Sequence, residues 1–446
     1  MVIDIPKKQK ERVVIIGGGF GGIQIAKALA KKDIQVVIVD KNNYHIFQPL
    51  LYQVATSVLE AESIAYPIRK IFKKAKNIFF RQGEVTSIEP EENKVYLGND
   101  ELYYDQLVIA SGAKTNFFGN EGLIISAMPM KNVLEALDLR SMVLQNFEKT
   151  LRNSNERKRQ GMMNIVIAGA GPTGVELAGA LGELKQHVLP KDYPELDFNQ
   201  MNVYIVQSGD RVLPMLSEKS SSRAKKYLEK LGVTVVLNTR VLDFFGDYVQ
   251  TNTGKDIIAR TLIWTAGVIG NPVEGLGKKV INNGGRIAVD EYNKVKGHEN
   301  IYAIGDVACM GSEEFPRGHP MVAPAAIQQG RNLAKNLSNQ LKGKPMKPFK
   351  YKDKGAMATV GKNKAVVEMN KLKLGGSFAW FIWMAVHLMS LVGFRNRAIT
   401  FFNWTKNYFS SDRGMRLIIT KFDLQEQKRQ RKKKWQREQL KKEVNK

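Results

Sequence analysis

Cysteine is almost missing from this sequence. Cys309 is the only one among 446 residues. A single cysteine cannot form an intramolecular disulfide, a CxxC redox pair or a cysteine-based metal site. The five histidines show no HxxxH or similar ligand spacing. The sequence therefore excludes dithiol chemistry within the chain, and a metal site is not expected.

Acidic residues are also scarce, with 43 Asp and Glu against 68 Lys and Arg, so the net charge is +25. Such an excess calls for a polyanionic partner, either nucleic acid or an anionic membrane surface. No apolar signal region or Ser/Arg-rich transit peptide precedes the first predicted strand. Together with the cysteine content, this favours the cytoplasmic side of a prokaryotic cell.

The most informative stretch is residues 12–40, RVVIIGGGFGGIQIAKALAKKDIQVVIVD. An apolar β-branched run, residues 13–16, predicts a strand buried on both faces. Gly17, Gly19 and Gly22 follow as G-x-G-x-x-G, then a short helix over residues 23–30 and a second strand over 35–39 that ends in Asp40. The glycines allow a tight turn and a close approach to a pyrophosphate, and Asp40 is placed to accept hydrogen bonds from a ribose.

The chain then repeats this opening about 150 residues later. A strand over residues 164–168 leads into Gly169, Gly171 and Gly174, followed by a helix over 175–184 and a strand over 202–206. Two such motifs in one chain indicate dinucleotide binding far more specifically than a single motif does. The sequence therefore predicts that one chain binds two dinucleotides.

Other segments complete the expected α/β fold. Strands are predicted over residues 78–83, 94–97, 107–112, 262–267 and 301–308, and helices over 63–74, 132–152 and 323–341. Gly305-Asp306, at the end of the last of these strands, suits a hydrogen bond to the ribityl or pyrophosphate region of a flavin, which implies FAD in the first unit. The segment at residues 41–56 is aromatic and aliphatic but broken by Pro49, so it is either a packed connection or an apolar wall beside the cofactor.

The C-terminal region has a different character. The apolar run at residues 378–394 is interrupted by His387 and Ser390 and is too short for a membrane span, which needs about 20 residues. Residues 395–409 mix Arg and Lys with Trp, Phe and Tyr, as in a helix lying in a bilayer interface. The alternative is a buried helical hairpin. The basic tail, residues 421–446, predicts a helix attracted to anionic lipid head groups.

With these residues assembled, the chain resembles the type II NADH:quinone oxidoreductases, which are single-subunit, non-pumping respiratory flavoenzymes. The likeness covers nearly the full length. It rests on GGGFGG with HIFQPLLYQVAT, on GAGPTGVELAGAL, on AIGDVA and AIQQG, and on GFRNR and DRGMRLI near the C-terminus. The resemblance implies hydride transfer from NADH to non-covalent FAD, then electron transfer to a menaquinone or a ubiquinone at a membrane-facing surface.

The fold class implied is α/β, with two Rossmann-like dinucleotide-binding domains and a C-terminal amphipathic helical region that associates with the membrane. Residues 1–125 and 268–345 would form the FAD domain, 126–267 the inserted NAD(P)H domain and 346–446 the anchoring region. The enzyme would be peripheral, on the cytoplasmic face of the cell membrane. Whether it forms a homodimer is left open.

The resemblance also assigns residues to sites. Those expected to hold FAD are Gly17, Gly18, Gly19, Phe20, Gly21, Gly22, Asp40, Lys41, Ser111, Gly112, Asp306 and Ala326. Those expected to hold the nicotinamide nucleotide are Gly169, Gly171, Pro172, Thr173, Gly174, Glu176, Gln207, Ala266 and Gly267. Phe47, Pro49, Leu50, Leu51, Tyr52 and Gln328 would lie near the quinone head group. The expected catalytic residues are Glu176, near the stacked rings, with Gln328 and Gln329.

Two positions depart from the family pattern. The second unit's strand ends in Gln207, where an NADH-selective site would present an acidic residue to the adenosine ribose. A neutral amide does not repel a 2′-phosphate, so use of NADPH is an open alternative. Pro324 stands where many family members have Gln, which weakens a direct transfer of their quinone contacts to this chain.

Two other functions compete with quinone reduction. A soluble flavoprotein could reduce a disulfide or a protein electron carrier, but Cys309 has no partner for dithiol or sulfide:quinone oxidoreductase chemistry. A soluble carrier would leave the last hundred residues unexplained. A flavoprotein could instead bind nucleic acid, but the strongest run of basic residues in this chain directly follows the amphipathic residues 378–409. This order favours a membrane, and nucleic acid is not expected as a partner.

Overall fold

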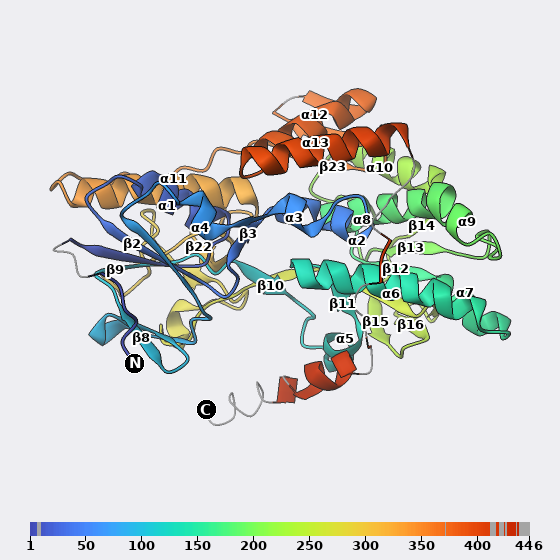
Figure 1. The fold of residues 1–446 in the computed structure, drawn as a ribbon, viewed down its shortest axis with the longest axis horizontal. Coiled ribbons are helices and arrows are strands. Elements are labelled where there is room, and N and C mark those ends of the chain that lie inside the picture. The colour runs from blue at the N-terminus through green and yellow to red at the C-terminus, as the bar shows by residue number, and fades with distance from the viewer. Residues whose placement is uncertain are drawn as a thin grey trace. The chain divides into compact units, whose positions relative to one another are not determined.

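The computed structural model describes residues 1–6, 10–370, 372–410, 416–418, 423, 426–433 and 435–436. The chain divides into two compact units, each assembled from separate segments (Figure 1). The first unit consists of Met1–Ile46, Ala65–Lys114 and Val268–Lys354, and the second of Phe47–Ile64, Thr115–Gly267 and the described part of Gly355–Lys446. Each unit is built around its own five-stranded sheet.

The sheet of the first unit has the strand order β21-β9-β1-β2-β5, and all of its neighbours are parallel. Its central strand β1 is buried from Val13 onward, as the unbroken apolar run predicts. Helix α1 (Phe20–Leu29) connects β1 to β2 and packs against α11 (Ala323–Gln340). The sheet strands are β1 (Arg12–Ile16), β2 (Gln35–Asp40), β5 (Ile78–Gln82), β9 (Gln106–Ile109) and β21 (Ile301–Ala303).

Smaller elements surround this sheet. The antiparallel sheet β6-β7-β8 covers one face, and β3 pairs with β4. The elements are β3 (Tyr44–Ile46), β4 (Ala65–Pro67), α4 (Ile68–Ile71), β6 (Ser87–Glu89), η2 (Pro90–Glu92), β7 (Lys94–Leu97), β8 (Asp100–Tyr103), β10 (Ala113–Thr115), β19 (Val268–Gly270), η4 (Lys278–Val280), β20 (Ile287–Ala288), η5 (Gly305–Val307) and β22 (Ala308–Cys309).

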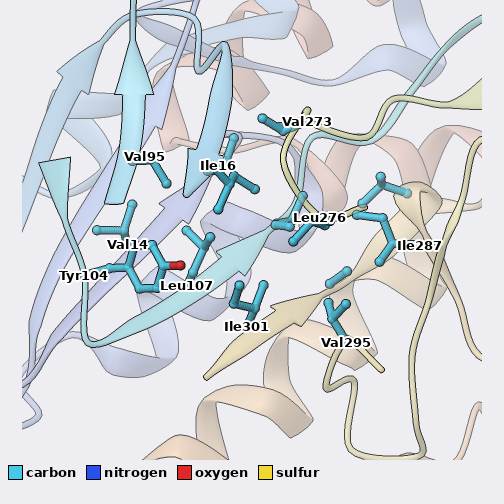
Figure 2. Packing of buried hydrophobic residues seen from close by; sticks show 14 of the residues in the cluster. Val14, Ile16, Val95, Tyr104, Leu107, Val273, Leu276, Ile287, Val295 and Ile301 are labelled. Atoms are coloured by element: carbon cyan, nitrogen blue, oxygen red, sulfur yellow. The ribbon is translucent and has the colours of Figure 1, made fainter. Parts of the chain in front are cut away.

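The core on this face of the first sheet joins segments that lie far apart in the sequence. Figure 2 shows Val14 and Leu107 of the parallel sheet together with Val95 of β7, while Leu276 and Val295 come from the returning segment. All five side chains are buried. The return of the chain after Val268 is therefore needed to complete the first core.

The second unit repeats the same sheet plan, with the order β11-β18-β12-β13-β14 and parallel neighbours throughout. The strands β12, β13 and β18 take the positions that β1, β2 and β9 hold in the first unit. The sheet strands are β11 (Met128–Pro129), β12 (Ile165–Ala168), β13 (Val203–Val206), β14 (Val233–Val236) and β18 (Thr261–Trp264). The predicted pair of dinucleotide folds is confirmed.

Helices make up most of the rest of this unit. The helix expected at residues 132–152 is α6 (Val133–Leu151), which begins with a capping box between Asn132 and Glu135. The other elements are η1 (Gln48–Leu50), α2 (Leu51–Ala55), α3 (Ala61–Ile64), α5 (Glu121–Ser126), α7 (Glu156–Met163), α8 (Pro172–Glu183), the π-helical turn η3 (Leu184–Val188), α9 (Leu189–Asp192), α10 (Glu218–Lys230), β15 (Val241–Phe244), β16 (Tyr248–Thr251) and β17 (Ile257–Ile258).

The C-terminal part begins with a three-stranded antiparallel sheet that the sequence analysis missed, formed by β23 (Ala356–Thr359), β24 (Ala365–Met369) and β25 (Leu372–Gly376). The helices α12 (Ser377–Ser390) and α13 (Phe394–Phe409) follow, and they contact each other (Figure 1). The expected helix at residues 395–409 is confirmed. Among the described residues, no helix is both long and apolar enough to cross a bilayer.

Two predictions about local structure need correction. Residues 63–74 do not form one basic helix: α3 ends at Ile64, β4 pairs with β3, and α4 begins after Pro67. Proline cannot donate the hydrogen bond of a helix interior, which explains the break. The expected strand at residues 301–308 ends at Ala303, because Gly305 turns the chain with a φ of 74°. Most of the expected tail helix lies outside the described residues.

Candidate functional site

The two glycine-rich turns have the same construction. Gly17 and Gly169, which follow β1 and β12, adopt φ values of 108° and 101°. A Cβ atom on Gly17 would collide with the carbonyl oxygen of Ala110, and one on Gly169 would lie 2.6 Å from the Cα of Ala266. Both positions therefore require glycine. The turns hold Ser111-Gly112 and Ala266-Gly267 of the neighbouring strand ends close to each loop.

The middle glycine of each motif faces open space. A Cβ atom on Gly19 or on Gly171 would meet no protein atom within 4 Å. Both residues are N-caps, of α1 and α8, and neither helix has a side-chain cap or an acidic residue in its first turn. These helix N-termini leave room and positive partial charge for a pyrophosphate, so the residues fit a bound dinucleotide.

The third glycine of each motif closes the turn. A Cβ atom on Gly22 would collide with the carbonyl oxygen of Gly17, and one on Gly174 with that of Gly169. In the second turn, Thr265 Oγ1 donates to the carbonyl oxygen of Ala168 or Gly169, at 2.9 Å in each case. Pro172 and Thr173 form the first turn of α8, where proline at N1 costs no hydrogen bond.

Asp40, at the end of β2, orders the first glycine-rich loop by hydrogen bonds. The carboxylate of Asp40 accepts the N–H of Gly18 at 2.6 Å and that of Asn42 at 2.7 Å. Burial raises the pKa of Asp40, and these two hydrogen bonds oppose the shift. Each carboxylate oxygen has further lone pairs. Asp40 can therefore accept from a ribose while it orders the loop, and the exposed Lys41 follows directly.

Gln207 occupies the equivalent place at the end of β13. Its Oε1 accepts the N–H of Ala170 at 2.9 Å, as Asp40 accepts that of Gly18. Because the backbone N–H needs an acceptor, the amide oxygen must face the loop, and the two donor hydrogens of Nε2 point away from that bond. Arg211 is bonded to Glu218 and to the carbonyl oxygen of Pro214, both at 3.3 Å.

Small residues bring α11 close to α1 and to the turn that carries Asp306. A Cβ atom on Gly330 would lie 2.9 Å from the carbonyl oxygen of Gly21, and one on Gly305 would lie 3.2 Å from Ala326 Cβ. Gln329 is buried, and its Oε1 accepts the N–H of Gly305 at 2.7 Å. This glutamine therefore fixes the turn at Asp306, the residue expected to hold FAD.

The side chain of Gln328 is bonded to the main chain of Lys352. Its Nε2 donates to the carbonyl oxygen of Lys352 at 2.9 Å, and its Oε1 accepts the N–H of Lys352 at 3.0 Å. The oxygen and one N–H of the amide are thus both bonded to the main chain of Lys352. Both glutamines belong to the first unit. Their expected roles beside a quinone remain predictions.

His45 supports the first loop and was not among the expected site residues. It is buried, its Nδ1 lies 2.8 Å from the carbonyl oxygen of Gly18, and its ring packs edge-on against Phe20. Burial lowers the pKa of His45 to about 4. The imidazole is therefore neutral near pH 7, with Nδ1 donating to Gly18. No sequence pattern signals this contact, because it joins residues 27 apart.

The second unit gathers Glu176, the segment at Phe47 to Tyr52 and helix α12. Glu176 is buried on α8, and burial raises its pKa to about 8. Its Oε1 accepts from Trp383 Nε1 at 3.2 Å and from the N–H of Thr359 at 3.5 Å. Phe47, Leu50, Leu51 and Tyr52 are all buried, with Pro49 partly covered. The predicted residues Glu176 and Tyr52 thus meet the same indole, that of Trp383.

A fold with two parallel dinucleotide-binding sheets and two glycine-rich turns defines a class of nucleotide-dependent flavin oxidoreductases. Residues 11–330 match the family model described as pyridine nucleotide-disulphide oxidoreductase, and residues 354–412 match the NDH2 C-terminal domain.

Individual relatives narrow this class. The type II NADH:quinone oxidoreductase NdhA of Mycobacterium tuberculosis is 35% identical over 428 residues, covering 92% of this chain and 90% of the relative. The type II NADH:quinone oxidoreductase of Staphylococcus aureus is 29% identical over 84% of this chain and 94% of its own length. The chain belongs to the type II NADH:quinone oxidoreductases.

Solved structures agree on the fold. NDH2 from Plasmodium falciparum in complex with NADH superposes with a TM-score of 0.85 at 22% identity, over 92% of this chain and all of the other. The sulfide:quinone oxidoreductase of Aquifex aeolicus has a TM-score of 0.70 at 20% identity, over 90% of this chain and 96% of the other. Identities this low establish the shared architecture and leave the chemistry to the residues.

Proposed function

We propose that the chain oxidises NADH and reduces a membrane quinone by way of FAD held non-covalently in the first unit, with the nicotinamide nucleotide in the second. The observation that carries this assignment is the pair of open helix N-termini at Gly19 and Gly171. FAD, when bound, supplies hydride acceptance and electron transfer to the quinone, so the protein contributes position and electrostatics. No step needs a protein nucleophile.

The residues of the first unit would bind and orient FAD. The N-terminus of α1 would take the pyrophosphate, Asp40 a ribose and Asp306 the ribityl region, with Gln329 fixing the turn of Asp306. Gly17 to Gly22, Phe20, Lys41, Ser111, Gly112 and Ala326 would complete this site. Its segments would be residues 1–125 and 268–345.

In the second unit, the N-terminus of α8 would take the pyrophosphate of the nicotinamide nucleotide, and Gln207 would face the adenosine ribose. Because Gln207 carries no negative charge, NADPH would be accepted alongside NADH. Glu176 would stand near the reacting rings and, with its pKa at about 8, would hold its proton at neutral pH. Residues 126–267 would form this domain.

Attachment to an anionic membrane surface is proposed from helix α13, whose polarity is inverted. Its buried residues are Asn396, Thr400 and Trp404, while Phe394, Phe402 and Phe409 are 86%, 70% and 84% exposed. A helix on a soluble protein shows the opposite arrangement. Burying phenylalanine in the acyl boundary beside Arg and Lys suits a bilayer interface. The proposed location is the cytoplasmic face of a prokaryotic membrane.

The assignment of the two turns is tested by filling the open space at each middle glycine. Gly19→Ala and Gly171→Ala introduce a methyl group that meets no protein atom, so we expect both variants to fold. Gly19→Ala should lose bound FAD, measured by absorbance after denaturation. Gly171→Ala should keep FAD and raise the KM for NADH about tenfold, as expected for a lost binding contribution of about 1.4 kcal/mol.

The matched control is Gly311→Ala. A Cβ atom there makes only an ordinary contact, 3.7 Å from the carbonyl oxygen of Pro316. FAD content and KM should stay at wild-type values. Full FAD retention in Gly19→Ala together with an unchanged KM in Gly171→Ala would remove the basis of the assignment.

A further inference from the structure

Trp383 is the polar contact of Glu176 that comes from helix α12. Its indole is 1% exposed, and its Nε1–H donates to Glu176 Oε1 at 3.2 Å. The other donor to this oxygen is the N–H of Thr359, at 3.5 Å. Helix α12 lies on β24 and β25 and also contacts β23, the strand that ends at Thr359. Glu176 is thus bonded to two elements of the C-terminal part.

The same indole also contacts the predicted quinone segment. Trp383 stacks on His387 with ring centroids 4.0 Å apart, and Tyr52 packs against it edge-on at 6.5 Å. His387 in turn contacts Phe47, with ring centroids 6.0 Å apart. Nδ1 of His387 lies 2.7 Å from the carbonyl oxygen of Trp383, which fixes the imidazole on the helix.

We propose that Trp383 is a positioning residue, whose indole N–H fixes the carboxyl group of Glu176 against the aromatic face formed by Phe47, Tyr52 and His387. The inference deepens the proposed function, because it rests on the proposed place of Glu176 beside the reacting rings. Truncation or displacement of α12 changes the orientation of Glu176 by this contact, even though α8 itself stays in place.

The electrostatic surroundings make this contact measurable. Burial is the largest cause of the raised pKa of Glu176, and the N–H groups of Thr359 and Trp383 oppose it by favouring the charged carboxylate. Loss of the indole N–H therefore raises the pKa of Glu176 further. The observable is an upward shift of the pH limb that belongs to this carboxyl group.

Several titratable groups on the elements packed around α8 have hydrogen-bond partners of their own. Helix α10 directs its buried residues Ser220, Ser221, Ala224 and Leu228 inward, and none of them carries a charge. On the neighbouring elements, Tyr52 is bonded to Gln53, His387 to the carbonyl of Trp383, Glu368 to Ser217 and Ser220, and Glu183 of α8 to the N–H of Lys362. Tyr204 of β13 and Lys185 and His187 of η3 also lie on elements that contact α8.

The test is steady-state turnover of the FAD-loaded, full-length enzyme with NADH and a water-soluble quinone analogue, across pH. Glu176→Gln should abolish the limb near pH 8. Trp383→Phe should shift that limb upward by about half a unit to one unit, as expected for a hydrogen bond lost to the charged form. The double variant should behave as Glu176→Gln alone. The KM for NADH should stay within about twofold of wild type while kcat changes.

Trp404→Phe is the matched control. Trp404 belongs to the same aromatic cluster, 5.9 Å from Trp383, and its Nε1–H donates to Gln53 Oε1 at 2.8 Å, away from Glu176. The pH limb of the Trp404→Phe variant should stay at its wild-type position. Should Trp383→Phe fail to fold, benzothienylalanine at position 383 keeps the shape of the indole and removes only the N–H.

An unshifted limb in both the Trp383→Phe and the benzothienylalanine variant, with the limb lost in Glu176→Gln, would overturn the role of Trp383 and leave that of Glu176 standing. An equal shift in Trp404→Phe would also overturn it, since a general loosening of the cluster would then explain the effect. A limb that survives in Glu176→Gln would overturn the proposed role of Glu176, and this inference with it.

Discussion

Asp40 and Gln207 stand at equivalent positions, and each accepts the N–H of the residue between the first two glycines of its loop, Gly18 and Ala170. One side chain carries a negative charge and the other does not. The loop is therefore ordered in both units, while only the first unit would oppose a phosphate on an adenosine ribose bound there. We therefore predict that the charge of this one residue, whose structural role is the same in both units, sets the selectivity between NADH and NADPH.

Gln207→Glu should keep the loop and change the selectivity. A glutamate still offers an oxygen to the N–H of Ala170, and its charge repels a 2′-phosphate. We expect NADH to remain the better substrate and the kcat/KM for NADPH to fall about tenfold relative to NADH, which corresponds to about 1.4 kcal/mol. The measurement is kcat/KM for both nucleotides in both enzymes.

The control for this substitution is Arg211→Lys. Arg211 is already bonded to Glu218 and Pro214, so the nucleotide ratio should not change. Undetectable NADPH turnover in the wild type, or an unaltered ratio in Gln207→Glu, would show that Gln207 is not the selector.

Asp306→Ala should lower FAD occupancy. We expect the carboxylate of Asp306 to hold the flavin by a charge-assisted hydrogen bond, which contributes about 1.5–3 kcal/mol. Asp306 also lies within electrostatic range of the buried Arg286. Asp306→Asn, which keeps a hydrogen-bonding oxygen, should lose less FAD than the alanine variant. Full flavin retention by Asp306→Ala at micromolar protein would contradict the assignment.

Glu176 should make the stability of the protein depend on pH. Its pKa rises from 4.5 in the unfolded chain to about 8 in the folded one. A raised pKa favours folding fully below the unfolded value, and this contribution is lost as pH rises through the folded value. Relative to Glu176→Gln, the wild type should therefore lose up to about 1.4 kcal/mol of unfolding free energy per pH unit across this window.

Denaturant unfolding of both proteins, at several pH values between the two pKa values, measures the difference. Both should unfold with the same dependence on pH outside the window. A constant gap between wild type and Glu176→Gln across the window would mean that the carboxyl group titrates at an ordinary pKa in the folded protein.

Sequence reasoning found the residues of the glycine-rich turns because their chemistry is local. Gly17 and Gly22 collide with main-chain atoms if any Cβ is added, and such requirements leave a fixed spacing in the sequence. Contacts such as Trp383 with Glu176, which are 207 residues apart, leave no pattern. They are determined by how α12 lies on β24, which the sequence alone does not reveal.

Helix α13 has two faces of different composition, a buried face with Asn396 and Thr400 and an exposed face with phenylalanines. Asn396 donates to the carbonyl of Glu62 at 3.1 Å, and Asn407 donates to the carbonyl of Val58 at 3.0 Å. These amides join the inner face of α13 to residues 58–62 of the same unit. The phenylalanines are thereby left on the outer face. Removing α12 and α13 altogether would also remove Trp383 from Glu176, so point substitutions are the sharper test.

The triple variant Phe394→Gln, Phe402→Gln, Phe409→Gln should bind anionic vesicles at least tenfold more weakly than the wild type. Each exposed phenylalanine contributes about 1.5–3 kcal/mol when it is buried in an apolar environment. Turnover of NADH with a water-soluble acceptor should persist, because none of the three residues lies in either nucleotide turn. Vesicle flotation and an acceptor assay measure the two effects.

A second triple variant controls for general loss of surface hydrophobicity. Leu134, Met215 and Phe245 are 68%, 55% and 53% exposed in the same unit, outside α12 and α13. Their replacement by glutamine should leave vesicle binding unchanged. Equal loss of binding in both triple variants would contradict a membrane face on α13.

Elements with a strong local pattern, long or short, were predictable, and elements without one were not. Helix α6 begins at Asn132 with a capping box that the sequence displays, and its bounds agree with the prediction. The segment at residues 63–74 looked helical by its charge pattern, yet pairing of β4 with β3 decided its structure. The strands β23 to β25 are stabilised by pairing with one another, and the sequence shows no periodicity that predicts them.

The net charge of +25 is distributed unevenly along the chain. Residues 421–446 carry eleven basic and four acidic residues. Part of this tail is held by the second unit in the structure: Gln427 donates to Asp138 at 3.1 Å, and Arg431 donates to the carbonyl of Ala127. Figure 1 shows this described part beside α5, away from α12 and α13. The tail is therefore not a simple continuation of the phenylalanine face.

Deletion of residues 421–446 should leave vesicle binding that is weaker and much less dependent on salt. The phenylalanines of α13 remain, and their burial is nearly insensitive to ionic strength, whereas the tail charges act only within a Debye length, about 10 Å at 0.1 M salt and about 3 Å at 1 M. Flotation with anionic and with neutral vesicles, at low and high salt, separates the two contributions. FAD content should be unaffected, because the proposed flavin site lies in the first unit. Full-length protein that stays soluble with anionic vesicles at low salt would rule out membrane attachment, and the electron acceptor would then have to be sought among soluble molecules.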